Sequence, residues 1–525
     1  MSSGRELIWI YGPPGSGKSL IGREMARRLS VPFWDVDEQI QSSSGASIPE
    51  IFDREGEAGF RSRESLALAS LTSQASGVIA LGGGALLDGG NRAQVESAGR
   101  VICLDAPAAT LLERVQRGAD SRPLVAGELT ARLEALLASR REHYASFPLR
   151  IDSSPPGDQV AWDALIRLGA FHVRGMGDGY DVRVEKGGLA MIGERLASRR
   201  LRGPLAVVTD ENVADHYGER VVRSLLSAGY QASLITLPAG EAHKTIQTIH
   251  HIWDGLLAAR LERSSTVVAL GGGVVGDMAG FAAAAYLRGV AWVVLPTSLL
   301  AMADSSLGGK TGVDLPQGKN LVGAFHSPRL VLADPDTLGS LPEAELRAGL
   351  AEVVKSGVIA DAALFALCEA GWGAVQGRLD EIVRRSMAVK ISVIEADPFE
   401  QGVRASLNLG HTIGHAVELV SGYRLRHGEA VAIGMVAEAR LAEQIGIAQA
   451  GLADQISSTL SGLGLPVALP AGLDHQAILT AMQVDKKRLA GSLLFVLPIR
   501  IGEVRTGIEV NLQDQAIRAS LFGHS

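Results

Sequence analysis

The sequence predicts a mixed α/β protein in two parts. The first part is a domain with a parallel sheet and flanking helices, and the second has an α/β half followed by an α-helical half. Three observations support this prediction. A chain of 525 residues is too long for a single hydrophobic core. Strand and helix patterns alternate at the start of the chain and again from Tyr180 to about Leu330. Helical periodicity dominates from Leu341 onward.

The overall composition is that of a globular protein and argues against some classes of partner. The chain is 46% hydrophobic and 20% charged, and its net charge of −7 gives no basic field that would favour nucleic acid. Cys103 and Cys368 lie far apart, which is typical of reduced thiols in a cytoplasmic protein. No apolar run reaches membrane-spanning length, and no signal peptide precedes the first strand. We therefore expect a cytoplasmic protein without a membrane or nucleic-acid partner.

The first functional motif is a phosphate-binding loop. Leu7–Ile10 reads as a buried strand, GPPGSGKS follows from Gly12 to Ser19, and an amphipathic helix continues to Leu29. Glycines in such a loop let backbone N–H groups face phosphate oxygens at a helix N-terminus. Lys18 would reach the outer phosphates, and the Ser19 hydroxyl would bind magnesium. The loop glycines are Gly12, Gly15 and Gly17. The motif predicts binding of ATP with Mg²⁺.

The residues after this loop occur in an order that resembles the shikimate kinase family. They are the strand Phe33–Asp37 ending in two acids, the run Gly59-Phe60-Arg61-x-x-Glu64, the strand Val78–Leu81 with Gly82-Gly83-Gly84 after it, Arg122-Pro123-Leu124, and the helical residues Arg140 and Tyr144. The resemblance covers about the first 170 residues and implies the P-loop kinase fold. One departure is Glu142, where the family usually has a proline two residues before the tyrosine.

The shikimate kinase resemblance assigns roles to these residues. It implies that shikimate is held by Asp37, Arg61, Gly83 and Arg140. It implies that Asp35 assists Ser19 at magnesium, that Arg117 contacts ATP, and that Arg122 closes from a lid to neutralise the transferring phosphoryl group. Each residue alone has an ordinary explanation, such as a helix ion pair between Arg61 and Glu64. Their joint order after a phosphate-binding loop favours the functional interpretation.

The domain boundary is predicted from composition. Pro155-Pro156-Gly157 reads as a turn before a closing helix, and Gly175-Met176-Gly177-Asp178-Gly179 reads as a short flexible linker. The predicted domains are residues 1–170, an α/β half at 171–330, and an α-helical half at 331–525.

A second glycine-rich turn opens the α/β half. The strand Thr266–Leu270 runs into G-x-G-x-x-G at Gly271, Gly273 and Gly276, with Asp277 next. The acid that a Rossmann site needs roughly 20 residues later is missing, so a plain Rossmann assignment fails. The flanks of this turn and of Gly82–Gly84 differ completely, which argues against an internal repeat.

The stretch from Asn408 to Gly434 contains three histidines. His411 and His415 are four residues apart and would share a helix face, and His427 follows a loop. Imidazoles brought together across a turn are part of a catalytic zinc site, which needs three protein ligands and an open position. Spacing alone makes His411 and His415 a ligand pair, and surface histidines are the ordinary alternative.

The run NLGHTIGHA followed by HGEAVAIGM resembles the metal-site region of the 3-dehydroquinate synthase family. The resemblance extends from about Tyr180 to the C-terminus. It implies that His411 and His427 bind zinc, or cobalt in its place, with Glu352 as third ligand. It also implies that His415 contacts the substrate phosphate and that Lys355 contacts substrate.

The same resemblance implies an NAD site and an anionic substrate site. The NAD positions are Asp210, Glu241, Lys244, Gly272, Gly273, Asp277, Thr297 and Ser298. The substrate positions are Asp304, Lys310, Lys319, Asn320, Lys390, Arg404, Asn408 and Lys486. Lys310, Lys355 and His415 would take part in catalysis. Arg288 would reach a catalytic site across a dimer interface, which implies a homodimer formed through the synthase part.

The two resemblances together imply a bifunctional shikimate-pathway enzyme. The kinase would phosphorylate shikimate, and the synthase would convert the keto-sugar acid phosphate DAHP to 3-dehydroquinate. NAD would oxidise a ring hydroxyl transiently, phosphate would be eliminated, and an aldol step would close the ring. One alternative is a zinc-dependent polyol dehydrogenase joined to a regulatory nucleotide-binding module. Another is a P-loop ATPase scaffold that binds partners.

Overall fold

The computed structural model describes residues 6–118, 126–400, 402–484, 488–489, 492–511 and 518–520. The chain divides into two compact units. One comprises residues 1–172 with 197–200, and the other comprises residues 173–196 with 201–525. Among the described residues, no helix is both long and apolar enough to cross a membrane.

The glycine-rich segment from Gly175 to Gly179 is packed on the second unit. Arg174, just before it, donates to Glu395 at 3.0 Å, and the Met176 side chain is only 6% exposed. A Cβ on Gly175 would lie 2.8 Å from Pro398. The expectation of a flexible linker at this segment was therefore wrong, because buried contacts hold it. The predicted domain bounds remain a prediction.

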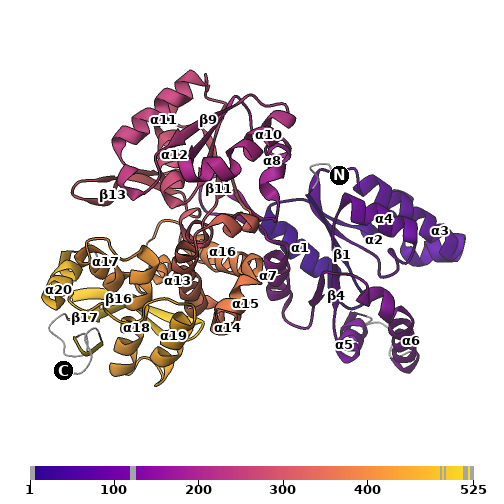
Figure 1. Cartoon of the computed structure of the whole chain (residues 1–525). Helices are drawn as coiled ribbons and strands as arrows, with labels where there is room; N and C mark the ends of the chain where they lie inside the picture. Colours follow the sequence, from indigo (N-terminus) through magenta and orange to yellow (C-terminus); the bar gives the residue numbers. More distant parts are fainter. Residues whose placement is uncertain are drawn as a thin grey trace. The chain divides into compact units, whose positions relative to one another are not determined.

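The first unit is a five-stranded parallel sheet in the order β2-β3-β1-β4-β5. Its strands are β1 (Glu6–Tyr11), β2 (Phe33–Asp35), β3 (Ser76–Ala80), β4 (Gly99–Asp105) and β5 (Arg150–Asp152). Its helices are α1 (Lys18–Leu29), α2 (Val36–Ser44), α3 (Ile48–Leu71), α4 (Gly89–Ala98), α5 (Ala108–Gly118), α6 (Ala126–Ala145) and α7 (Gly157–Leu168). Helices α1 and α7 pack side by side (Figure 1).

Local sequence explains the main boundaries in this unit. Helix α3 begins with a capping box, in which Ser47 and Glu50 satisfy each other's backbone N–H groups. Asp35 caps α2 by accepting from the N–H of Asp37, so the strand ends at Asp35 and Asp37 lies in the first helical turn. The expected strand to Asp37 was therefore two residues too long. Apolar residues of β1 and β3 form the core with Phe60 and Phe147.

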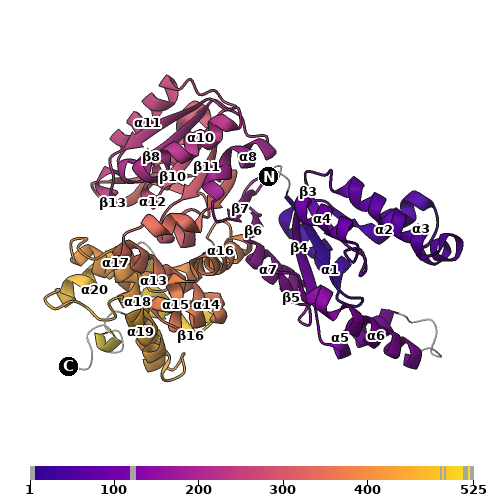
Figure 2. The same cartoon turned by 45° about the vertical axis from the view of Figure 1, so that its right-hand side comes forward.

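The second unit contains a sheet in the order β6-β7-β14-β11-β10-β8-β9. Six of these strands, β7, β14, β11, β10, β8 and β9, run parallel to one another. The strands are β6 (Ala170–Val173), β7 (Tyr180–Val184), β8 (Leu205–Asp210), β9 (Ala232–Leu237), β10 (Thr266–Gly271), β11 (Ala291–Pro296) and β14 (Leu330–Ala333). The helices of this half are α8 (Ile192–Ser198), α9 (Glu211–Val213), α10 (Glu219–Ser227), α11 (Ile246–Ala258) and α12 (Gly273–Ala285). Figure 2 shows α8, α10, α11 and α12 around the strands of this sheet.

Alternation along the strands places helices on both faces of this sheet. Val293 and Leu295 of β11 pack in one cluster with apolar residues of α8 and α10. Trp292, which points the other way, contacts Gly280 of α12. The sheet is therefore covered on both sides, as parallel sheets are. A separate antiparallel hairpin, β12 (Lys310–Leu315) with β13 (Gly318–Phe325), follows the sheet strands β10 and β11.

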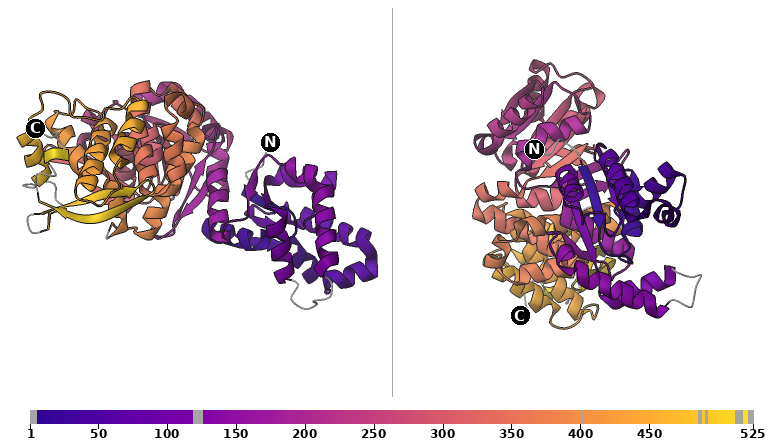
Figure 3. Two further views of the ribbon diagram at one scale, coloured as in Figure 1. Left: turned by 90° about the horizontal axis from the view of Figure 1, so that it is seen from below. Right: turned by 90° about the vertical axis from the view of Figure 1, so that its right-hand side faces the viewer.

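The remainder of the unit is mainly helical. Its helices are α13 (Glu343–Ala360), α14 (Ala362–Glu369), α15 (Trp372–Gln376), α16 (Leu379–Ala396), α17 (His411–Val420), α18 (His427–Gln444), α19 (Leu452–Gly462) and α20 (His475–Val484). Three strands, β15 (Arg488–Leu489), β16 (Ser492–Arg500) and β17 (Glu503–Val510), form an antiparallel sheet that packs on α18 (Figure 3). The expected α-helical half is therefore confirmed, and the small antiparallel sheet near its end is an addition that the helical pattern did not predict. A short apolar run such as that in β16 does not distinguish strand from helix by periodicity.

Glycines bring the backbones of α13, α17 and α18 into direct contact. A Cβ on Gly434 would lie 2.0 Å from the carbonyl oxygen of Gly410, and one on Gly428 would lie 1.9 Å from that of Ala348. A Cβ on Gly414 would lie 2.9 Å from the carbonyl oxygen of Ala430. No side chain fits at these positions, so glycine is what allows the three helices to approach this closely.

Candidate active sites

The phosphate-binding loop lies between β1 and α1. Its glycines adopt positive φ angles of 143° at Gly12, 81° at Gly15 and 80° at Gly17, a region that side chains disfavour. A Cβ on Gly12 would lie 2.4 Å from the carbonyl oxygen of Leu104. The loop thus turns sharply and directs its backbone towards the first turn of α1. This is the geometry in which helix N–H groups bind phosphate oxygens.

Two side chains at this loop make polar contacts within the chain. The Lys18 ammonium donates to the carbonyl oxygen of Pro13 at 3.1 Å, and burial lowers its pKa. The Ser19 hydroxyl donates to Asp35 at 2.5 Å. A hydroxyl and a carboxylate side by side next to a phosphate-binding turn are oxygen ligands of the kind that Mg²⁺ prefers.

The predicted shikimate residues gather around the glycine run after β3. Arg140 donates to the carbonyl oxygen of Gly83 at 3.1 Å. Arg61 lies against Gly84, where a Cβ would meet its guanidinium at 2.7 Å, and a Cβ on Gly82 would lie 3.5 Å from Asp37. Burial, followed by the charge of Asp35, raises the pKa of Asp37. Two guanidinium groups and a carboxylate therefore face one turn, which suits a polyhydroxylated carboxylic acid.

Three side chains at this turn were not singled out for function from the sequence. Tyr144 and Tyr11 donate to the same Gly83 oxygen, at 2.8 and 3.2 Å. The Glu64 carboxylate is fully buried and accepts from Arg61 at 2.6 Å. Arg61 and Glu64 therefore form the ion pair that their helical spacing suggests. Because Glu64 is buried, it holds the Arg61 guanidinium in a fixed position. A tyrosine at the end of a strand gives no signal of this kind in sequence.

The two remaining kinase residues lie apart from this turn or outside the description. Arg117 is exposed on α5 and pairs with Glu113. Arg122 lies outside the described residues.

The glycine turn of the second unit lies at the carboxyl ends of β8, β10 and β11. Gly272 precedes α12, and the N–H of Thr297 donates to the carbonyl oxygen of Gly271 at 3.0 Å. A Cβ on Gly272 would lie 3.5 Å from the Ser298 hydroxyl, and one on Gly273 would lie 2.8 Å from the Ser305 hydroxyl. Dinucleotides bind at this edge of parallel sheets, where glycine lets a pyrophosphate approach the backbone.

Charged residues surround the glycine turn. The buried Lys244 donates to Asp277 at 2.6 Å and to Asn320 at 2.5 Å. Burial raises the pKa of Asp277 to about 6, although the Lys244 ammonium opposes that shift. Asp210 caps α9 by accepting from the N–H of Val213 at 3.0 Å, and Glu241 begins the next short helical turn. Through its hydrogen bonds to Asp277 and Asn320, Lys244 joins the α/β half to the hairpin that carries Asn320.

A group of metal-ligand side chains is formed by Glu352, His411 and His427. One ligand atom from each lies within 4.8 Å of the others. The Nε2 atoms of His411 and His427 lie 3.5 and 3.6 Å from Oε1 of Glu352, which is too long for a hydrogen bond. Within the described part of the chain, both buried oxygens of Glu352 lack a hydrogen-bond partner, although the Lys355 ammonium lies against one of them.

The outer nitrogens of both histidines are held in place. Nδ1 of His411 lies 3.1 Å from the carbonyl oxygen of Leu409, and Nδ1 of His427 lies 3.2 Å from Glu418. When the imidazole is neutral and Nδ1 carries its proton, each Nε2 presents its lone pair towards Glu352. Acceptors on the outer nitrogen are the usual second layer of a zinc site. The residues therefore fit a divalent metal such as zinc.

Electrostatics around this group keep the carboxylate ionised. Burial alone would raise the pKa of Glu352, but Lys355 and the histidines hold it well below the ordinary range. Burial and the Lys355 ammonium lower the pKa of His411, so its imidazole is neutral. Burial opposes protonation of His427, but the carboxylates of Glu352 and Glu418 raise its pKa to about 9. A metal binding here would displace that proton.

A cavity of about 600 Å³ extends from His411 to Asp277, the residue that follows the glycine turn. Its lining includes most of the predicted substrate residues, namely Asp304, Lys310, Asn320, Lys355, Lys390, Arg404 and Asn408. Lys390 donates to Asp304 twice at 2.6 Å, and Lys355 donates to the carbonyl oxygen of Leu407 at 2.8 Å. Four cationic side chains on one cavity suit a substrate that carries a phosphate and a carboxylate.

Some predicted residues lie beside this cavity or apart from it. His415 is exposed, with its ring centroid 5.1 Å from that of His411 and 5.8 Å from that of His427. Lys319 donates to Glu418 at 2.9 Å. Arg288 is exposed in an unusual conformation with φ of 69°. Lys486 lies outside the described residues.

Two acids near the predicted cations were not anticipated. Glu400 pairs with Lys310 at the cavity, and Glu418 links Lys319 to His427. Glu400 stands in no motif. Glu418 lies within the stretch from Asn408 to Gly434, seven residues after His411, but no role was predicted for it.

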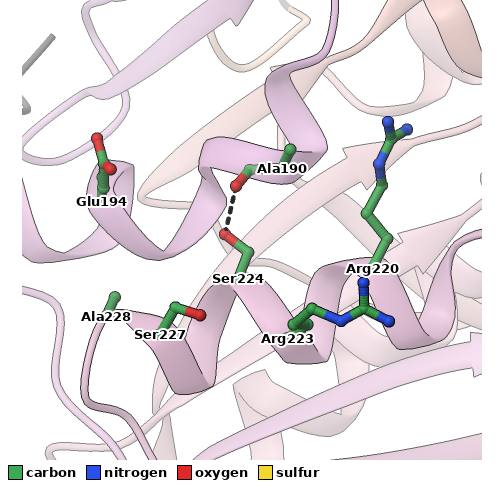
Figure 4. Close-up of a pocket in the computed structure, with 7 residues that line it drawn as sticks. All are labelled: Ala190, Glu194, Arg220, Arg223, Ser224, Ser227 and Ala228. Carbon is green, nitrogen blue, oxygen red and sulfur yellow. Dashed lines mark hydrogen bonds between the residues drawn. The ribbon is translucent and has the colours of Figure 1, made fainter. Parts of the chain in front are cut away.

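A second cavity, of about 310 Å³, lies on the α/β half between α8 and α10 (Figure 4). Its described lining is Ala190, Glu194, Arg220, Arg223, Ser224, Ser227 and Ala228, none of which was predicted to function. Ser224 donates to the carbonyl oxygen of Ala190 at 2.8 Å, which closes one side of it. None of the predicted site residues is therefore in the described lining of this smaller cavity.

Comparison with known proteins decides the family. Models of the 3-dehydroquinate synthase N-terminal and C-terminal domains match residues 234–348 and 349–488. The 3-dehydroquinate synthase of Nostoc punctiforme is 50% identical over 338 residues, which are 63% of this chain and 93% of that protein. The chain belongs to the 3-dehydroquinate synthase family. The enzyme of the same name from a Synechococcus strain is 50% identical over 334 residues, which cover 62% of this chain and 91% of that protein.

The first domain belongs to a different family. The shikimate kinase model matches residues 14–162. The chain is therefore a bifunctional enzyme of the shikimate pathway, with a kinase and a synthase activity. The polyol dehydrogenase alternative and the non-catalytic scaffold are not favoured, because both parts match biosynthetic enzymes.

Solved structures of two other synthases resemble the synthase part. A 2-deoxy-scyllo-inosose synthase complexed with carbaglucose-6-phosphate, NAD⁺ and Co²⁺ aligns with a TM-score of 0.62 and 27% identity, covering 67% of this chain and all of that one. The 2-epi-5-epi-valiolone synthase from Streptomyces hygroscopicus subsp. jinggangensis, with NAD⁺ and Zn²⁺ bound, aligns with a TM-score of 0.60 and 30% identity, covering 65% of this chain and 95% of that one.

Proposed function

We propose that the kinase site uses the glycine run after β3 to hold shikimate and the loop after β1 to hold ATP. Arg61 and Arg140 would bind the shikimate carboxylate, and Asp37 would accept a hydrogen bond from the hydroxyl that attacks ATP. The buried Glu64 and the Gly83 carbonyl oxygen, which already hold these arginines, support this assignment. Pre-placed charges suit phosphoryl transfer, in which positioning and electrostatics dominate.

The phosphate side of the kinase supplies positive charge. Lys18 would leave Pro13 to bind the outer phosphates, and the loop N–H groups would hold the others. Ser19 and Asp35 would hold Mg²⁺, which neutralises charge on the transferring phosphoryl group. Arg117 is proposed to contact ATP, and Arg122 is proposed to neutralise the transferring phosphoryl group.

In the synthase part we propose that Glu352, His411 and His427 hold a divalent metal, zinc or cobalt. Such an ion polarises the oxygens of the bound substrate. The main support is chemical, because the buried Oε1 of Glu352 has no hydrogen-bond partner among the described residues and faces the Nε2 atoms of both histidines. Lys355 lies against the same carboxylate and extends to the cavity, where it would contact the substrate.

NAD is proposed to bind along the glycine turn of β10. Gly272 and Gly273 would contact the pyrophosphate, with Thr297 and Ser298 beside them. Asp210, Glu241, Lys244 and Asp277 would hold the ribose and adenine side. When bound, NAD supplies reversible hydride transfer. Since the family's net reaction is not an oxidation, the cofactor is regenerated in each cycle.

The large cavity between these two groups is proposed to bind DAHP. Lys310, Lys390 and Arg404 would bind its anionic groups, and Asp304, Asn320 and Asn408 would bind ring hydroxyls. Lys319, Lys486 and His415 would complete the phosphate side. His415, free of the metal, would help manage the proton of the leaving phosphate. Removal of substrate from water among these groups would strengthen each contact.

Location and assembly are also proposals. A cytoplasmic enzyme with small-molecule substrates is consistent with the absence of a spanning helix among the described residues. We propose a homodimer in which Arg288 reaches the partner's site. Its exposed position and strained backbone support an unusual role.

Two coupled assays on the purified full chain test the pair of activities. One supplies shikimate with ATP and Mg²⁺, and the other supplies DAHP with NAD and zinc. We expect ADP release in the first and phosphate release in the second. Absence of phosphate release from zinc-loaded, NAD-supplied protein would refute the synthase proposal, and an ADP rate that does not depend on shikimate would refute the kinase proposal.

A further inference from the structure

Glu418, which neither the sequence motif nor the family comparison assigned, lies between the metal group and a predicted substrate cation. It is on α17, seven residues after His411, and only 7% of its surface is exposed. One oxygen lies 3.2 Å from Nδ1 of His427, and the other accepts from the Lys319 ammonium at 2.9 Å. The single buried carboxylate of Glu418 therefore contacts both His427 and Lys319.

Each of these contacts fixes one partner. A carboxylate on Nδ1 keeps the proton on that nitrogen, so Nε2 of His427 is left to face Glu352. The second contact holds the β13 lysine, whose ammonium also lies 4.6 Å from the ring centre of Tyr423. One carboxylate therefore contacts side chains from two other elements, His427 of α18 and Lys319 of β13.

We propose that Glu418 is a positioning residue that sets both the metal-binding tautomer of His427 and the place of Lys319 beside the substrate cavity. This inference rests on the proposed metal site and deepens it. Glu418 is not placed as a ligand itself, because its two oxygens are already used by these donors. Its effect on turnover would pass through His427 and Lys319.

The test begins with zinc affinity of the substrate-free full chain, measured by competition with a chromophoric chelator. We expect Glu418→Gln, which keeps one weaker acceptor, to bind zinc about 10-fold more weakly and Glu418→Ala up to about 100-fold more weakly. Glu343→Gln is the matched control. It removes a glutamate from an exposed ion pair with Arg347 on α13, the helix that carries Glu352, and should leave zinc affinity unchanged.

A second measurement separates positioning from simple structural support. In zinc-saturated protein, both Glu418 variants should raise KM for DAHP, because Lys319 is released. The visible spectrum of the cobalt-loaded Glu418 variants should shift relative to the cobalt-loaded parent, since the donor strength of His427 changes. Lys319→Met should raise KM while leaving the cobalt spectrum in place, because it does not touch His427.

The outcomes distinguish this inference from the metal assignment. If His427→Ala loses zinc while Glu418→Gln binds it within about twofold of the parent, the inference is overturned and the metal site stands. A lower Tm of zinc-free Glu418→Gln with unchanged zinc affinity would also overturn it, by showing support for the fold alone. Retention of zinc by His427→Ala would overturn the metal site and this inference together.

Discussion

The Lys355 ammonium contacts the Glu352 carboxylate one turn away on α13, and each of the two side chains is 2% exposed. A buried ion pair costs a large desolvation free energy, and hydrophobic residues of the same volume are often no less stable. The pair therefore adds little as a structural bond. It makes sense as a preorganised site, in which the lysine keeps an otherwise unsatisfied carboxylate ionised and ready for a cation.

The metal group gives the first prediction. His411→Ala and His427→Ala should each weaken zinc binding by more than the roughly 10- to 100-fold expected for loss of an outer-shell partner. Synthase activity should fall in parallel, because the substrate loses its polarising ion. Zinc content by atomic absorption and phosphate release are measured on the same sample. Full zinc occupancy in either variant would remove that histidine from the ligand set, and His415 would be the next to test.

His415 should behave differently from its neighbours. His415→Ala should keep its zinc and bind NAD, since Glu352, His411 and His427 already supply three ligands. DAHP turnover should slow by about 10²- to 10⁴-fold, the usual contribution of a positioned acid or base. The loss should appear in phosphate release. Zinc lost in proportion to activity would show that His415 is a ligand.

Lys18 allows the two activities to be separated in the intact chain. Lys18→Met removes the ammonium that neutralises the outer phosphates, so shikimate-dependent ADP release should fall by about 100-fold or more. Synthase turnover should be unchanged. Arg27→Met, which removes an exposed cation from the end of the same helix, is the matched control and should retain kinase activity. Loss of both activities in Lys18→Met would instead indicate a folding defect.

Asp277 gives a stability prediction that depends on pH. Its folded pKa of about 6 lies above the ordinary value of 3.8. Between these values the folded chain holds a proton that the unfolded chain releases, so this contribution to stability is present at low pH and is lost as pH rises through 6. Relative to Asp277→Asn, the wild-type chain should lose about 1 kcal/mol between pH 5 and pH 7.

The measurement for Asp277 is the Tm of the synthase transition in the two proteins at both pH values, without NAD. A loss of this size corresponds to a few degrees. An equal Tm difference at pH 5 and pH 7 would show that Asp277 ionises at its ordinary pKa in the folded chain.

Sequence reasoning located elements well where periodicity and a motif agreed. The strand before Gly12 and the strand that runs into Gly271 lie within about one residue of expectation, because buried apolar strands bounded by a glycine turn give clear patterns. It erred where a side chain decided the boundary, as at Asp35, whose capping bond starts a helix early. It also missed β15–β17, because a nine-residue apolar strand with a proline has no distinctive period.

For the sites, sequence supplied residues with a motif and missed those defined only by tertiary contact. His411 and His427 could be chosen because they flank a glycine-rich turn. Glu418 and Tyr11 could not, because a helical glutamate and a strand-end tyrosine occur everywhere. Their role comes from which atoms meet after folding, across separations such as the 99 residues between Lys319 and Glu418.

The backbone contacts among α13, α17 and α18 limit which amino acids this part of the synthase can accept. Gly410, Gly414, Gly428 and Gly434 have no side chain that could take part in the chemistry, yet even a methyl group at any of them would meet a main-chain atom. A scan of all single substitutions should therefore find that changes at these four glycines reduce synthase activity as much as changes at His411 and His427. Change of metal or substrate preference in this scaffold would have to come through side chains around the cavity, because the frame that carries the ligands has no room to shift.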